Sequence, residues 1–199
     1  WIISLTAARE SLREFVKTRQ MTIVSQYLHR VRNENGLDIL TLTDPQGRVL
    51  LRSRNPEILG DDQSQDQLVE KALQKNIAAG PEIVDREELS KEGKDLADQA
   101  LIEFIPTPKA APRAGNRETS GLMLKAAAPI LDEDNSLFGV LYGGILLNRN
   151  FEIVDQVKDT VFKGERYKGR ETGTATIFQY DLRISTNVKN EQGERAIGT

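Results

Sequence analysis

Apolar residues recur at three- and four-residue spacing along the first 34 residues of the chain. They are Leu5, Ala8, Leu12, Phe15, Val24, Tyr27, Leu28 and Val31. This spacing is typical of an amphipathic helix, and Asn35-Gly36 supplies a signal for its end. The pattern predicts one long helix over residues 1–34. Such a helix exceeds what one small sheet can cover, so we expect its first half to pair with a second protomer or to lead toward a membrane.

The period changes after this helix. β-rich runs over 37–43 and 48–53 flank an Asp-Pro-Gln-Gly turn and predict a hairpin. Two strongly apolar runs, 121–130 and 137–147, flank the acidic turn 132–135 and predict a second one. Together with the helices, these strands predict an α+β fold, in which helices flank one antiparallel sheet.

Further helices are expected between and after these hairpins. Ser64, with Gln67 three residues later, has the pattern of a capping box and predicts a helix to about Asn76. Asn150 is expected to cap another helix. The stretch 86–99 is highly charged and contains a glycine, so any helix there is expected to be exposed and weak.

The last part of the chain repeats the layout of the first hairpin. Residues 164–173 form a charged connector, and a β-rich run over 174–178 is followed by a turn and a strand over 182–186. We therefore predict one module over 1–163, and over 164–199 a connector with the first hairpin of a truncated second module. The alternative is that this hairpin extends the first sheet.

Composition excludes several classes of function. A net charge of −3 and a pI of about 5.4 give no basic field for nucleic acid. The chain has no cysteine and one histidine, so zinc thiolate sites, cysteine nucleophiles and multi-histidine metal sites are excluded. Neither a catalytic motif nor the EF-hand pattern occurs, so we expect no catalytic residue, no metal and no cofactor. No run of apolar residues in the sequence is long enough to span a bilayer. The apolar start at Trp1 is either the tail of a transmembrane helix or an arbitrary boundary.

Three segments carry a resemblance to a known family. Leu42-Thr-Asp-Pro-Gln-Gly-Arg-Val-Leu-Leu-Arg-Ser-Arg-Asn-Pro56 with Gly60-Asp-Asp62, and Ala127-Ala-Pro-Ile-Leu-Asp-Glu-Asp-Asn-Ser-Leu-Phe-Gly-Val-Leu-Tyr-Gly-Gly144, resemble the PAS-like Cache sensor domains of bacterial receptors. Gly173-Thr-Ala-Thr-Ile-Phe178 with Arg183-Ile-Ser-Thr-Asn-Val188 and Arg195-Ala-Ile-Gly-Thr199 is similar to the opening of a second module. The resemblance covers 37–199 in pieces, with 86–120 unmatched.

The resemblance implies a PAS-like antiparallel sheet and a periplasmic segment held between two transmembrane helices of an inner-membrane receptor. Its output would be a histidine kinase, with catalytic parts outside this chain, or alternatively a chemotaxis receptor. A homodimer formed through the N-terminal helix is expected. A third possibility is a dimerisation module without any ligand.

Candidate ligand contacts gather on the strands. Strand alternation places Arg52 and Arg54 on one face at the end of the second strand, where guanidinium forks suit a carboxylate. The other interpretation is that both arginines are solvated or paired with Asp61, Asp62 or Asp66. In the family that the sequence resembles, members with an arginine on this strand often have histidine at the position of Arg54, and this departure puts the ligand rather than the fold in doubt.

Three further residues complete the predicted site. Lys125 interrupts an apolar strand and is either an outward edge charge or a ligand contact, the role that basic groups on central strands often have in the family. Tyr142 on the neighbouring strand either adds a hydroxyl to the pocket or belongs to the core. His29 is a ligand contact or a residue of the helix surface. The expected partner is a small-molecule carboxylate such as acetate.

Overall fold

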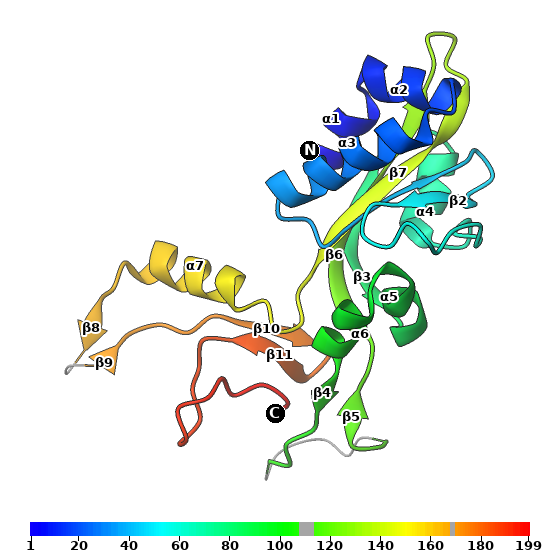
Figure 1. The fold of residues 1–199 in the computed structure, drawn as a ribbon. Coiled ribbons are helices and arrows are strands. Elements are labelled where there is room, and N and C mark those ends of the chain that lie inside the picture. Colours follow the sequence, from blue (N-terminus) through cyan, green and yellow to red (C-terminus); the bar gives the residue numbers. More distant parts are fainter. Residues whose placement is uncertain (108–113, 168–169) are drawn as a thin grey trace.

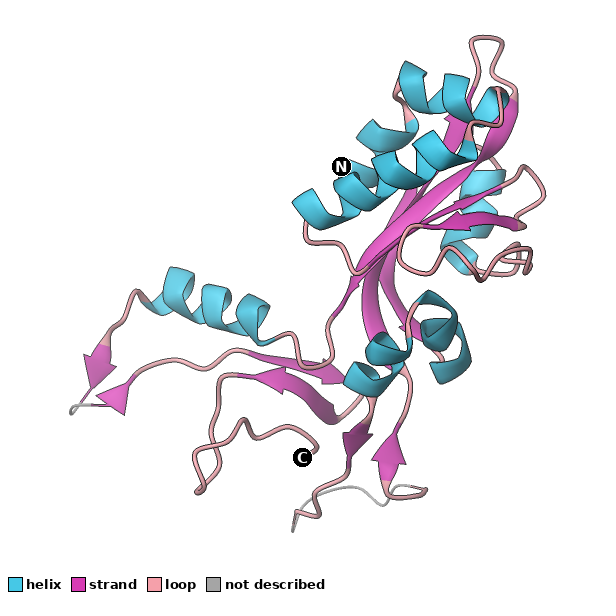
Figure 2. Cartoon of the chain, in the orientation of Figure 1, coloured by secondary structure: helices cyan, strands magenta, loops and turns pink. Residues whose placement is uncertain are grey.

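The computed structural model describes residues 1–107, 114–167 and 170–199, and its centre is a five-stranded antiparallel sheet (Figures 1 and 2). The strands lie in the order β2-β1-β7-β6-β3. Their bounds are Ile39–Thr43 for β1, Val49–Arg52 for β2, Ala78–Val84 for β3, Gly121–Leu131 for β6 and Leu137–Leu146 for β7. Both predicted hairpins, β1–β2 and β6–β7, are present, and the α+β fold is confirmed.

The N-terminal residues cover one face of this sheet, but the prediction of a single long helix is wrong. They form α1 (Ile2–Ala7), α2 (Glu10–Lys17) and α3 (Met21–Glu34). The backbone is extended at Arg9, and Arg19 lies in the left-handed region with φ of 55°. These breaks fold α2 back against α3 (Figure 1). One face of a small sheet can then bury apolar residues from the whole segment, which a straight helix would leave exposed.

The opposite face of the sheet is covered by α4 (Gln67–Leu73), α5 (Arg86–Glu92) and α6 (Lys94–Ala100). Asp66, rather than Ser64, caps α4, because its carboxylate accepts the backbone N–H groups of Leu68 and Val69. The prediction of a weak, exposed helix over 86–99 is wrong. Leu89 and Leu96 are fully buried against the sheet despite the charges around them.

The C-terminal part has a separate small core. It contains α7 (Phe151–Phe162), capped by Asn150 as predicted, and the antiparallel pair β10 (Thr176–Gln179) and β11 (Leu182–Thr186). Short pairs β4 (Ile102–Glu103) with β5 (Arg117–Glu118), and β8 (Arg166–Tyr167) with β9 (Arg170–Glu171), lie at the periphery. The core residues are Ile102, Leu147, Leu182 and Ile184. None of the helices in the described ranges is both long and apolar enough to cross a bilayer.

The hairpins β1–β2 and β10–β11 share two backbone details. Each has a β-bulge at the same place in its register, at Leu42/Thr43 and at Ile177/Phe178. In each, the chain returns through a glycine with positive φ: Gly60 donates to the Val49 carbonyl, and Gly198 donates to the Arg183 carbonyl, both at 2.8 Å. Helix α3 directly precedes the first hairpin, whereas the short pair β8–β9 separates α7 from the second. The likeness seen in the sequence therefore extends to hydrogen bonding.

Candidate ligand-sensing site

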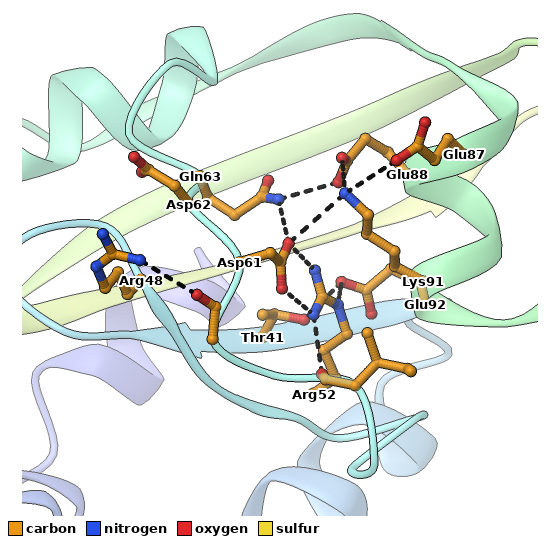
Figure 3. Close-up of polar contacts among 12 residues, drawn as sticks. Thr41, Arg48, Arg52, Asp61, Asp62, Gln63, Glu87, Glu88, Lys91 and Glu92 are labelled. Carbon is orange, nitrogen blue, oxygen red and sulfur yellow. Dashed lines mark hydrogen bonds and ion pairs between the residues drawn. The ribbon is translucent and has the colours of Figure 1, made fainter.

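Arg52, the last residue of β2, lies at the centre of a buried polar cluster (Figure 3). Its guanidinium makes a two-point contact with Asp61, from Nη1 to Oδ1 at 2.7 Å and from Nη2 to Oδ2 at 2.8 Å. Nη1 also donates to the Ile58 carbonyl at 2.9 Å, and Nε donates to Glu92 at 3.1 Å. A fully buried arginine with this set of acceptors is a rigid anchor for carboxylate groups.

Glu92 closes the cluster from the end of α5. Its Oε1 accepts hydrogen bonds from Arg52 and from the Thr41 hydroxyl at 2.8 Å, whereas its buried Oε2 has no hydrogen-bond partner. Burial raises the pKa of the Glu92 carboxyl. The hydrogen bonds from Arg52 have the opposite effect on Asp61 and lower the pKa of its carboxyl to about 2. One carboxylate is thus firmly ionised, and the other is held in an environment unfavourable to its charge.

Further charges surround Asp61 on its solvent side. Gln63 donates to Asp61 and to Glu88, both at 2.9 Å, and Lys91 forms ion pairs with Glu88 and with Asp61. The loop after β2 and helix α5 are therefore tied together by polar contacts that converge on Arg52 (Figure 3).

The register of the sheet connects this cluster to Tyr142. Thr41 pairs with Arg52 on one side and with Tyr142 on the other, so the three side chains form a row across β2, β1 and β7 on one face. Tyr142 is 2% exposed. Burial raises the pKa of its phenol, and the charge of Glu92 adds to this effect.

Lys125 lies on β6 beyond Tyr142, with its Nζ 4.8 Å from the centre of the Tyr142 ring. The ammonium forms ion pairs with Asp66, the cap of α4, and with Glu82 of β3 at 3.1 Å. Burial lowers the pKa of Lys125 to about 7 and raises the pKa of Glu82. The sheet therefore places a second buried cation on the same face as Arg52.

Of the five predicted contacts, Arg52, Tyr142 and Lys125 lie together on this face, whereas Arg54 and His29 lie elsewhere. Arg54 follows the end of β2, and its guanidinium pairs with Asp95 of α6 at the rim. His29 belongs to α3, where its ring contacts the Ser53 carbonyl at 3.4 Å and the Asn33 amide at 2.9 Å. Strand alternation does not extend to Arg54 because β2 ends at Arg52.

The partners of the basic residues were partly visible in the sequence. Pairing of the two arginines with Asp61, Asp62 or Asp66 was one of the two interpretations, and the structure pairs Arg52 with Asp61. The pairing of Lys125 with Asp66 was not predicted, and the buried Lys125 is not an outward edge charge. Glu92 was not predicted as a site residue, because the many charged residues of 86–99 indicated an exposed helix. The available signal was the spacing of Leu89, Leu96 and Ala100, which lie on the buried side of α5 and α6. No cluster of potential metal ligands occurs in the ranges that the structure describes.

Comparisons with known proteins agree with this architecture. Residues 145–199 match the family model described as single Cache domain 3. The periplasmic domain of Vibrio cholerae LuxQ has the same fold, with a TM-score of 0.53 and 14% identity over 96% of this chain and 70% of that one. A domain of a putative sensory box/GGDEF family protein from Vibrio parahaemolyticus has a TM-score of 0.52 and 13% sequence identity. The match covers 92% of this chain and 62% of that one.

The E. coli DcuS sensor domain gives a TM-score of 0.46 and 18% identity, over 74% of this chain and 85% of that one. A search of curated protein sequences found no match. The chain therefore has the PAS-like α+β fold found in such periplasmic domains, and its C-terminal part, residues 145–199, is similar to a Cache domain.

Proposed function

We propose that this domain senses a small organic anion, such as a short carboxylic acid, outside the cytoplasm and signals its presence to a histidine kinase across the inner membrane. The observation that carries the proposal is the pair of buried cations, Arg52 and Lys125, on one sheet face with Tyr142 between them. Buried cations need anionic partners, and here carboxylates of the domain, Asp61 for Arg52 and Asp66 for Lys125, stand where a ligand carboxylate could bind instead. The Arg52 guanidinium can hold a carboxylate through two parallel hydrogen bonds, and the Lys125 ammonium can attract it as a single point charge.

In the proposed mechanism, the carboxylates of the domain occupy the position of the ligand. Asp61 lies in the loop after β2, and Glu92 ends α5. A ligand carboxylate that takes over one of these contacts with Arg52 would release the loop or the helix from the sheet. A ligand that binds the released form more tightly than the closed form shifts the balance between the two. The displaced element then carries the change toward the rest of the receptor.

Thermal denaturation with a panel of short organic acids and amino acids tests this proposal. A ligand at 100 times its Kd should stabilise the domain by about 2.7 kcal/mol. Arg52→Lys keeps the positive charge but loses the two-point contact of the guanidinium, so it should strongly reduce the stabilisation by the ligand. Arg86→Lys is the matched control, because Arg86 lies on α5 and pairs with Asp98 near the surface. If no compound stabilises the wild-type domain, the anion proposal is wrong.

We propose that the N-terminal helices form a homodimer contact and that transmembrane helices flank the domain in the receptor. Support comes from exposed apolar side chains at the N-terminus, where Trp1, which precedes α1, is 95% exposed and Leu5 of α1 is 60% exposed. Sedimentation measurements on the wild type and Leu5→Glu test the contact. A monomer at all concentrations would contradict it.

We also propose that residues 164–199 begin a second module of the same design. The support is the shared bulge and glycine return of the two hairpins, together with the family match over 145–199. Limited proteolysis tests the division, since cleavage within 164–173 should leave a folded 1–163 fragment. Cleavage products that unfold together would contradict it.

A ligand-free dimerisation module is the second candidate. The observation that favours it is that Asp61 and Glu92 already satisfy Arg52 within the domain. This function predicts no stabilisation by any acid and an unchanged dimer in Arg52→Lys. A chemotaxis receptor is the alternative output, and the signalling region attached to the domain distinguishes it from a kinase.

A further inference from the structure

A second candidate site lies where the two parts of the chain meet. A cleft of about 540 Å³ is bounded by β4, by the start of α7 and by the C-terminal segment 190–197. A hydrogen bond from the Ile105 N–H to the Gly198 carbonyl, at 2.8 Å, joins the C-terminal segment to the residues that follow β4. The volume lies in the range of small-molecule sites, which often occur between structural units. The apolar lining residues are Leu101, Ile102, Ile105, Phe151 and Ile197.

Arg149 is a cationic residue of the cleft lining whose guanidinium has hydrogen-bond donors available to a ligand. Its backbone lies in the left-handed region with φ of 55°, a conformation that L-residues rarely adopt and that often marks a functional position. The strained position is fixed by a hydrogen bond from its N–H to the Ile184 carbonyl at 2.9 Å. One guanidinium nitrogen, Nη2, donates to the Leu101 carbonyl at 3.0 Å. Among the residues that the structure describes, no carboxylate forms an ion pair with Arg149.

The other arginine of the cleft is already committed. Both terminal nitrogens of Arg195 contact Asp155, at 2.7 and 2.6 Å, and its guanidinium lies 5.0 Å from the centre of the Phe151 ring. This arrangement makes Arg195 part of the wall. Arg149 is therefore the group available to a ligand.

Two exposed carboxylates, Glu103 and Glu194, also line the cleft. Glu194 accepts a hydrogen bond from the Asn190 side chain at 3.3 Å. Asp155 already neutralises Arg195, so these two carboxylates face Arg149 and would repel the second charge of a doubly negative ligand once its first charge had neutralised Arg149. A ligand with one negative charge and an apolar body avoids this repulsion.

We propose that this cleft binds an amphipathic monocarboxylate, with its carboxylate on Arg149 and its aliphatic chain over Ile105, Ile197 and Phe151. This site is distinct from the Arg52 cluster. The cluster lies between β2, the loop after it and α5, whereas the cleft lies between β4, α7 and the C-terminal segment. Because its walls come from both parts of the chain, an occupied cleft holds α7 and the C-terminal segment against β4. The protein would thus respond to a second kind of ligand at the junction.

Isothermal titration calorimetry of the 199-residue chain with octanoate tests the proposal. One octanoate per chain should bind, and Arg149→Gln should weaken binding at least tenfold. Ile105→Asp, at a position 49% exposed and therefore tolerant of change, should weaken it as well. Arg86→Gln is the control for loss of a surface arginine and should leave the affinity unchanged. Octanol, with the same chain and no charge, should bind at least tenfold more weakly than octanoate.

The outcomes separate this site from the Arg52 cluster. Octanoate binding should persist in Arg52→Lys, whereas the response to short acids such as acetate should persist in Arg149→Gln. The junction proposal is overturned if octanoate fails to bind, if octanol binds equally well, or if Arg149→Gln has no effect. Loss of octanoate binding in Arg52→Lys alone would assign that ligand to the sheet cluster and would also overturn the junction site.

Discussion

Arg52 and Asp61 form a two-point ion pair in which the guanidinium is fully buried and the carboxylate remains partly accessible. The pair joins the end of β2 to the loop that returns past it, and Glu92 adds a contact from α5. The arrangement links the end of β2, the loop that follows it, and α5, whose Glu92 lies 40 residues after Arg52. It therefore contributes to stability as well as providing the proposed anchor for a ligand.

Replacing Arg52 by alanine should destabilise the domain by about 3–5 kcal/mol, because Glu92 would be left buried without its cation. Chemical denaturation measures this change as a lower midpoint. Arg86→Ala is the matched control, since the side chains of the Arg86–Asp98 pair are 40% and 46% exposed and the pair should contribute at most about 1 kcal/mol. Equal effects of the two substitutions would show that the buried cluster is not a stabilising element.

Close approach of the backbone at Gly139 gives a second prediction. A Cβ atom at this position of β7 would lie 2.2 Å from the Thr43 carbonyl oxygen of β1. Gly139→Ala should therefore separate these strands and cost about 1–3 kcal/mol. Gly80→Ala on the edge strand β3 is the control, because a Cβ there meets open space and alanine lowers the entropy of the unfolded chain. Thermal unfolding should show a lower Tm for the first variant only.

The sequence predicted the strands of the sheet more reliably than the helices that cover it. The β1–β2 turn contains Asp44, whose carboxylate accepts the N–H groups of Gln46 and Arg48, so the hairpin is specified by local chemistry. The break at Arg19 has no such local signal. It is favoured because tertiary packing brings Leu12 and Leu28 onto the same sheet face. Periodicity alone cannot distinguish one long helix from two helices folded together.

The same limit applies to the site. Alternation along β2 placed Arg52 but failed for Arg54, which lies beyond the end of the strand. The expectation that Lys125 and Tyr142 lie near each other came from the family resemblance and from their positions on the neighbouring strands β6 and β7. Glu92 reaches Arg52 across 40 residues of sequence, and this contact depends on how α5 docks on the sheet. Contacts of this kind are fixed by the packing of Leu89 and Leu96 rather than by any motif.

Asp66 has two roles that a pair of substitutions can separate. Its Oδ1 caps α4, and its Oδ2 pairs with Lys125. Asp66→Asn keeps a good capping group but removes the charge, whereas Asp66→Ala removes both. Alanine should therefore be about 1 kcal/mol more destabilising than asparagine in urea denaturation. If the two variants are equally stable, the cap has no measurable role.

Lys125 gives a pH dependence with a defined sign. Its pKa falls from the ordinary lysine value of 10.5 to about 7 in the folded domain because of burial. Between these two values the unfolded chain holds the proton and the folded domain releases it. Stability should therefore rise from pH 7 to pH 9.5, by at most about 1.4 kcal/mol per pH unit. Below pH 7 both forms are protonated, and this contribution becomes constant.

Lys125→Met is the variant that isolates this effect, because methionine has a similar length and does not titrate. The measurement is the free energy of unfolding of both proteins at pH 7, 8, 9 and 9.5. The difference between wild type and variant should move in favour of the wild type as the pH rises. Tyr142 does not interfere in this window, since burial raises the pKa of its phenol above the ordinary value of 10.0. A constant difference would mean that the ion pairs with Asp66 and Glu82 keep Lys125 charged in the folded domain.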